Sequence, residues 1–182
     1  MTRQECINKI SELKSTDDLV LFWSRVKERD TSEWQSGKAL EYLIIRAFEL
    51  NGADVSYPYD IYKNGKPFEQ IDGFVYVNNL SCLIECKDYD SEMADFTPLA
   101  KIRSQLLRRP SQTIASIFCI TGFTEPAKIL ATYAAPQTIL LWEGTEIAHV
   151  LDSNCICSSL IKKYKIFTER CIPDYNTLTN SL

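Results

Sequence analysis

Apolar and polar positions follow two different periods along the chain of 182 residues. Apolar residues three and four positions apart predict two short helices in the first 30 residues, then helices at about 36–51, 96–109, 146–151 and 158–171, and one that begins at Thr124. Apolar and β-branched runs predict strands at about 53–59, 68–77, 80–87, 113–121 and 138–142. This order of elements predicts an α/β fold with a mixed central sheet and helices on both of its faces.

The composition is that of one ordinary globular domain. Hydrophobic residues make up 45% of the chain and charged residues 24%, and no repeat or Gly/Ser linker interrupts the sequence. The longest apolar runs are far shorter than the ~20 residues that cross a bilayer, and the first residues lack the apolar core of a signal peptide. We therefore expect a cytoplasmic protein that does not contact a membrane.

Histidine and cysteine limit the chemistry that the chain can perform. His149 is the only histidine, which makes a serine or cysteine nucleophile with a histidine base improbable. The seven cysteines include no C-x-x-C pair and are expected to be reduced. A zinc site of His149, Cys155, Cys157 and Cys171 is conceivable, but this spacing matches no common zinc pattern. Catalysis would therefore depend on carboxylates, lysine and a bound metal.

A predicted hairpin brings polar residues together in an apolar sheet. Asn78 and Asn79 tolerate the left-handed backbone of a two-residue turn, so the numbers of paired residues should sum to 157. Asp72 then faces Glu85 and Gln70 faces Lys87. Because side chains alternate between the two faces of a strand, these four would project from one face, with cross-strand spacings of ~5 Å.

Two carboxylates placed so closely need a compensating charge. At ~5 Å they repel by about 3 kcal/mol at an effective dielectric constant near 20. Oxygen ligands from Asp72 and Glu85, completed by a carbonyl group and water, suit Mg²⁺, and Mn²⁺ could substitute for it. Lys87 would place a positive charge beside a metal-bound water and a phosphate under attack. The alternative is a purely structural ion pair of Lys87 with either acid.

The same residues resemble the active-site set of a known nuclease superfamily. Glu41 on a helix, QIDGF at 70–74 and IECKD at 84–88 resemble the pattern of the PD-(D/E)xK nucleases. The downstream segment 120–151 is similar to the Mrr-type catalytic domains of type IV restriction endonucleases. This resemblance extends over about 36–152 and implies a restriction-endonuclease-like αβββαβ core.

The resemblance also implies a role for each site residue. Asp72 and Glu85 would coordinate Mg²⁺, Lys87 would be the catalytic lysine, and Glu41 would be an accessory acid. Gln70 is similar to the polar residue that often precedes the aspartate in Mrr-type sites, and we expect it to contact substrate. The implied reaction is Mg²⁺-dependent hydrolysis of phosphodiester bonds in DNA, in restriction, defence or DNA processing.

A basic helix follows the two acidic strands. The net charge of −4 argues against a uniformly basic surface, but the segment 96–113 carries four basic residues and no acid. Lys101, Gln105, Arg108 and Arg109 recur at helical spacing and are expected to share a face that contacts DNA phosphates without selecting sequence. A merely solvated helix face is the alternative.

These expectations divide the chain into three parts and leave two rival functions. We expect an N-terminal helical extension (1–35), a nuclease core (36–152) and a C-terminal helical tail packed on the core (153–182). A single small site cuts one strand, so double-strand cleavage implies a homodimer, and a separate partner could supply sequence specificity. The rivals are a structure-specific nuclease similar to Holliday-junction resolvases and a catalytically silent binding module of the same fold.

Overall fold

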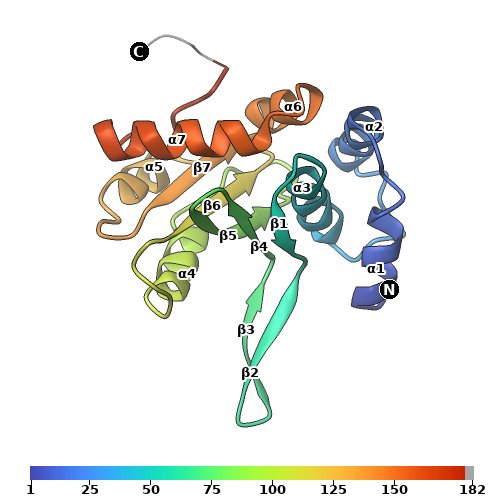
Figure 1. Ribbon diagram of the computed structural model, residues 1–182, viewed down its shortest axis with the longest axis horizontal. Helices are drawn as coiled ribbons and strands as arrows, with labels where there is room; N and C mark the ends of the chain where they lie inside the picture. Colours follow the sequence, from blue (N-terminus) through green and yellow to red (C-terminus); the bar gives the residue numbers. More distant parts are fainter. Residues whose placement is uncertain (179–182) are drawn as a thin grey trace.

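The computed structural model describes residues 1–178, and a five-stranded mixed sheet lies at its centre (Figure 1). The helices are α1 (Arg3–Ile10), α2 (Thr16–Lys27), α3 (Lys38–Leu50), α4 (Thr97–Leu106), α5 (Glu125–Thr132), α6 (Gly144–Asp152) and α7 (Ile156–Arg170). The strands are β1 (Asp54–Ser56), β2 (Tyr59–Lys63), β3 (Lys66–Ile71), β4 (Gly73–Val77), β5 (Leu80–Lys87), β6 (Thr113–Cys119) and β7 (Ile139–Glu143). The predicted α/β class is confirmed. Residues 179–182 of the predicted tail lie outside the described residues.

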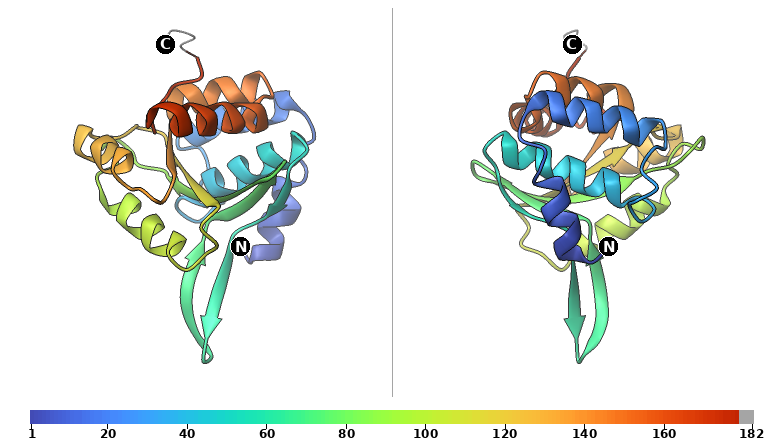
Figure 2. Two further views of the ribbon diagram at one scale, coloured as in Figure 1. Left: turned by 60° about the vertical axis from the view of Figure 1, so that its left-hand side comes forward. Right: turned by 90° about the vertical axis from the view of Figure 1, so that its right-hand side faces the viewer.

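Helices cover both faces of the sheet, whose strand order is β1-β4-β5-β6-β7 (Figure 2). β5 pairs antiparallel with β4 and parallel with β6, which makes the sheet mixed. One apolar cluster joins one face to α1, α2, α3, α6 and α7, and the second joins the other face to α4 and α5. No helix within residues 1–178 is long and apolar enough to cross a membrane.

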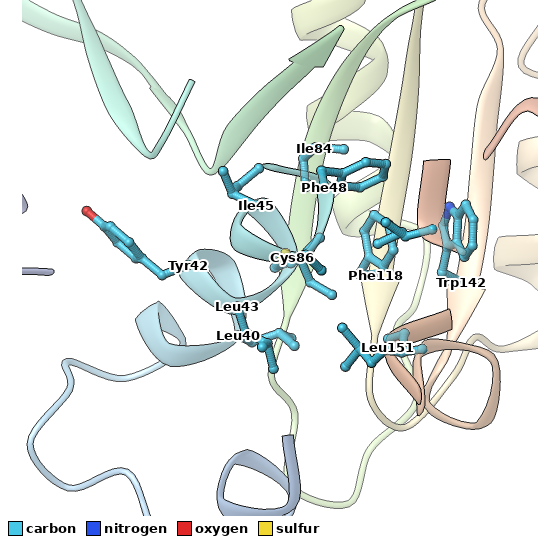
Figure 3. Packing of buried hydrophobic residues seen from close by; sticks show 14 of the residues in the cluster. Leu40, Tyr42, Leu43, Ile45, Phe48, Ile84, Cys86, Phe118, Trp142 and Leu151 are labelled. Carbon is cyan, nitrogen blue, oxygen red and sulfur yellow. The ribbon is translucent and has the colours of Figure 1, made fainter. Parts of the chain in front are cut away.

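The central helix α3 packs its apolar side directly on the sheet (Figure 3). Leu40, Leu43 and Phe48 are fully buried, as their helical spacing predicts. The Phe48 ring meets Phe118 of β6 edge-on with 6.2 Å between centroids, and Phe118 stacks on Trp142 of β7 at 5.0 Å. This packing fixes the height of α3 above β5, and with it the position of any polar side chain at the edge of the helix.

The predicted hairpin register is correct for β4 and β5. Val77 pairs with Leu80, and the ladder continues in that register to Gly73 and Ile84. Asn78 adopts the left-handed conformation with φ 52°, as expected for the turn.

The strand expected at 68–77 is in fact two strands, and this is a correction. β3 does not continue along β5 but pairs with β2 in a separate two-stranded sheet, so Gln70 lies opposite Asp60 and not opposite Lys87. The reason is a second hairpin turn at Asn64–Gly65, whose φ values are both positive. The resulting β2–β3 arm (residues 59–71) projects from the body of the protein (Figure 1).

Candidate active site

The candidate site lies where β4 and the β2–β3 arm part from β5. Asp72 is the residue between β3 and β4, and it is 5% exposed. Its Oδ2 accepts a hydrogen bond from the backbone N–H of Cys86 at 3.0 Å. Because β4 pairs with β5 only as far as Ile84, the carboxylate provides an acceptor for an amide beyond the end of that ladder. Burial, and then the charge of Glu85, raise the pKa of Asp72.

Glu85 and Lys87 are two positions apart on β5, and their side chains lie on the same face of the strand. The alternation of the strand places Cys86 in the cluster under α3, so its neighbours point to the opposite face, towards α4. Glu85 is 1% exposed, and its Oε1 accepts a hydrogen bond from Lys87 Nζ at 2.5 Å. Burial opposes the charge of Lys87, but the carboxylate of Glu85 outweighs it, so the pKa of Lys87 is raised. The lysine is therefore a stable cation beside a buried acid.

Lys101 also binds this acid, from α4. Its Nζ lies 2.8 Å from both Oε1 and Oε2 of Glu85. Its charge lowers the pKa of Asp72, against the effect of Glu85. Sequence periodicity places Lys101 on the basic side of its helix but gives no sign that its partner is a buried glutamate.

Glu41 joins the site from the edge of α3. It is 7% exposed, and Lys38 Nζ donates to its Oε2 at 2.6 Å. Burial, followed by the charge of Asp72, raises the pKa of Glu41 from 4.5 to about 7, and the Lys38 hydrogen bond only partly opposes this. Lys38 was not among the predicted residues, although its i, i+3 spacing from Glu41 is a recognisable signal.

The other predicted substrate-binding residues hold the base of the arm. Arg108 and Arg109 both form ion pairs with Glu69 of β3, whose side chain is 5% exposed. Gln105 is 4% exposed, and its Nε2 donates to the backbone oxygen of Gln70 at 3.1 Å. The open basic face that we expected on α4 is therefore wrong in part, because Arg108, Arg109 and Gln105 bind residues of β3. Glu69 was not among the predicted residues, because nothing in the sequence around it indicates two arginine partners about 40 positions away.

An open cavity of about 430 Å³ lies between α1, the start of α3 and the β2–β3 arm. Lys38, the partner of Glu41, lines it, and so do Arg3 and Gln70. Tyr59 and Tyr62 add aromatic surface on the side of the arm. Asp60 of the arm lines the cavity as well. The two cations suit phosphates and the aromatic rings suit flat bases, whereas the carboxylate of Asp60 opposes phosphate binding at its own position.

The donors at the site are suited to a hard divalent cation. Within residues 1–178 no group of three or more His, Cys, Asp or Glu side chains is arranged to hold a metal ion. Asp72 and Glu85 nevertheless provide two buried carboxylates that repel one another, with oxygen as the only ligand atom. This donor set fits Mg²⁺ or Mn²⁺ bound mainly through water and substrate, and does not suit a soft metal.

Comparisons with known proteins define the fold. No family model matches the sequence, and no curated protein matches it. The small subunit (R.BspD6I2) of the heterodimeric restriction endonuclease R.BspD6I is similar in structure, with a TM-score of 0.56 and 14% identity over 88% of this chain and 91% of that chain. A protein of unknown function, AF1548, matches with a TM-score of 0.49 and 20% identity over 60% of this chain and 62% of that chain, less than two thirds of its length. The likeness to the restriction endonuclease subunit shows that this chain has a restriction-endonuclease-like fold.

Proposed function

We propose that this protein is a metal-dependent DNA endonuclease of the PD-(D/E)xK type, similar to Mrr-type catalytic domains. The observation that carries the proposal is the meeting of Asp72, Glu85 and Lys87 where β4 parts from β5. Burying two acids beside each other costs stability, so a fold that keeps them points to a role in chemistry. The likeness to a restriction endonuclease subunit supports the same class of reaction.

Each residue has a role in this proposal. Asp72 and Glu85 hold Mg²⁺, for which Mn²⁺ can substitute. When bound, the metal supplies positive charge that polarises a phosphate and acidifies a coordinated water. Lys87 stabilises the negative charge that builds up on the attacked phosphate, because its ammonium is held charged beside Glu85. Glu41, with its pKa of about 7, can hold or release a proton near neutral pH as the accessory acid.

The substrate would approach from the cavity between α1 and the arm. Arg3 and Lys38 line this cavity and supply positive charge for phosphates, and Gln70 lies on the same wall. Arg108 and Arg109 contact DNA in this proposal only after they leave Glu69, so their contribution is smaller than that of an open basic face.

Cleavage of both strands needs a second active site. A homodimer of this chain would supply one, and so would a different subunit that also brings sequence specificity. The similar R.BspD6I2 is the small subunit of a heterodimeric enzyme, which favours a partner subunit as strongly as self-association.

Nicking of supercoiled plasmid tests the proposal. The wild-type protein with Mg²⁺ should convert the plasmid to open circles, and EDTA, Asp72→Ala and Lys87→Ala should each abolish this while DNA binding remains. Asp54→Ala on β1 and Lys165→Ala on α7 are matched controls, because both residues are exposed and lie outside the site. Equal activity of the wild type and both site variants would refute the proposed site.

The same assay separates the two rival functions. A substrate panel of linear, branched and single-stranded DNA distinguishes a restriction-type enzyme from a structure-specific one. A silent binding module would bind DNA in gel-shift experiments but would give no metal-dependent nicking with any substrate.

A further inference from the structure

Two lysines neutralise Glu85, and they differ in how firmly the fold holds them. Lys87 belongs to β5, and its side chain is 22% exposed. Lys101 reaches the acid from α4, and its side chain is 41% exposed. The ammonium of Lys101 can regain water when it leaves, but the carboxylate of Glu85 is buried, so Lys101 leaves readily only if another cation takes its place.

Lys101 takes the position on Glu85 that suits a cation best. Its Nζ is equidistant, at 2.8 Å, from both carboxylate oxygens, whereas Lys87 contacts Oε1 alone. The charge of Lys101 also acts on Asp72, so one ammonium compensates both of the acids that would hold a metal. Within residues 1–178, Glu85 is the only ion-pair partner of Lys101.

We propose that Lys101 is an internal cation that occupies the metal position on Glu85 until a divalent ion displaces it. This inference rests on the proposed function. Lys101 occupies both oxygens of Glu85, so a divalent ion that binds this carboxylate must displace it, whereas Lys87 contacts Oε1 alone and leaves Oε2 open. The released side chain, which is 41% exposed, can then donate from its ammonium to a phosphate of the substrate. Lys101 thus couples metal loading to substrate binding.

The test is direct measurement of Mn²⁺ binding by isothermal titration calorimetry, without substrate. Lys101→Met removes the competing ammonium but keeps an unbranched side chain of similar length. We expect it to bind Mn²⁺ about tenfold more tightly than the wild type, since the metal no longer displaces a cation. Arg103→Met removes one positive charge from an exposed position on the same helix and should change the affinity by less than about twofold. Lys101→Gln should behave as Lys101→Met does.

The outcomes separate this inference from the proposed function. Equal or weaker Mn²⁺ binding by Lys101→Met would overturn the inference. A lower melting temperature of the same variant would then show that Lys101 only stabilises the packing of α4 on β5. In that case nicking that still depends on Asp72 leaves the nuclease proposal standing. If neither protein binds Mn²⁺, the metal site itself is wrong, and both proposals fail. Glu85→Gln should abolish Mn²⁺ binding in both backgrounds.

Discussion

Ionisation of Glu41 should destabilise the folded protein, and Glu41→Gln should remove this cost. The carboxyl is 7% exposed, so solvent screens it little. Glutamine keeps the size of the side chain, and its carbonyl oxygen can still accept the hydrogen bond from Lys38. The substitution therefore changes the charge and little else.

The size of the effect follows from the pKa of Glu41. Below about pH 4.5 the carboxyl is protonated in the folded and unfolded chains alike, and it makes no difference to stability. As the pH rises from 4.5 to about 7, the folded chain retains the proton more tightly than the unfolded chain, so the free energy of unfolding falls. The loss is complete above about pH 7, and the difference between the two pKa values corresponds to about 3 kcal/mol.

Urea unfolding in EDTA at about pH 5 and about pH 8.5 measures this effect. Glu41→Gln should be more stable than the wild type by about 2–3 kcal/mol at the higher pH, and the two proteins should differ by less than about 1 kcal/mol at the lower. Glu49→Gln is a control on the same helix, because Glu49 pairs with Arg46 at 2.5 Å and accepts a hydrogen bond from Tyr57 at 2.7 Å. It should lower stability at the higher pH by about 1 kcal/mol.

A particular result would refute this reasoning. If Glu41→Gln is no more stable than the wild type at the higher pH, the ion pair with Lys38 outweighs burial and the repulsion from Asp72. Glu41 would then be a structural acid. Added Mg²⁺ should also narrow the gap between the two proteins, since a cation bound at Asp72 offsets the repulsion between Asp72 and ionised Glu41, which the variant lacks.

Three further substitutions test contacts that hold the fold together. Lys163→Met removes the cation that donates to the buried carboxylate of Glu146 at 2.8 Å, and it should lower the free energy of urea unfolding by about 3 kcal/mol; an unchanged value would mean that Glu146 takes up a proton instead. Gly144→Ala would bring a Cβ atom within 2.4 Å of the carbonyl oxygen of Ile120, so a loss of about 1–3 kcal/mol is expected in thermal unfolding, and a neutral result would contradict this close approach. Glu69→Ala removes the acceptor shared by two arginines of α4, and amide hydrogen exchange in the β2–β3 arm should become about tenfold faster while exchange in β6 stays the same.

The part of the site formed by residues close together in the sequence could be predicted from the turn and strand patterns. The Asn78–Asn79 turn fixes the register of β4 and β5, and alternation along β5 then places Glu85 and Lys87 on one face. The third helix, expected at 36–51, is found at Lys38–Leu50, because an apolar stripe of helical period ends there at Asn51–Gly52.

The predicted strand at 68–77 was wrong because two local signals compete there. The residues 68–77 alternate well enough to form one strand, but Asn64–Gly65 is an equally good turn and starts a second hairpin. The alternation of apolar and polar residues at 68–77 does not determine which strand each half pairs with. The partners of Lys101 and Arg108 were equally hidden, since helical spacing gives the face of a side chain and not the acid that lies across from it.

The arm and the acid Asp72 share one short stretch of backbone. β3 ends at Ile71 and β4 begins at Gly73, so no loop separates the arm from the sheet. Any macromolecule that bends the arm would therefore turn the peptide groups on either side of Asp72 and shift its carboxylate relative to Glu85. Binding to the distant arm would in this way change the spacing of the two acids, so the arm is mechanically coupled to the candidate site.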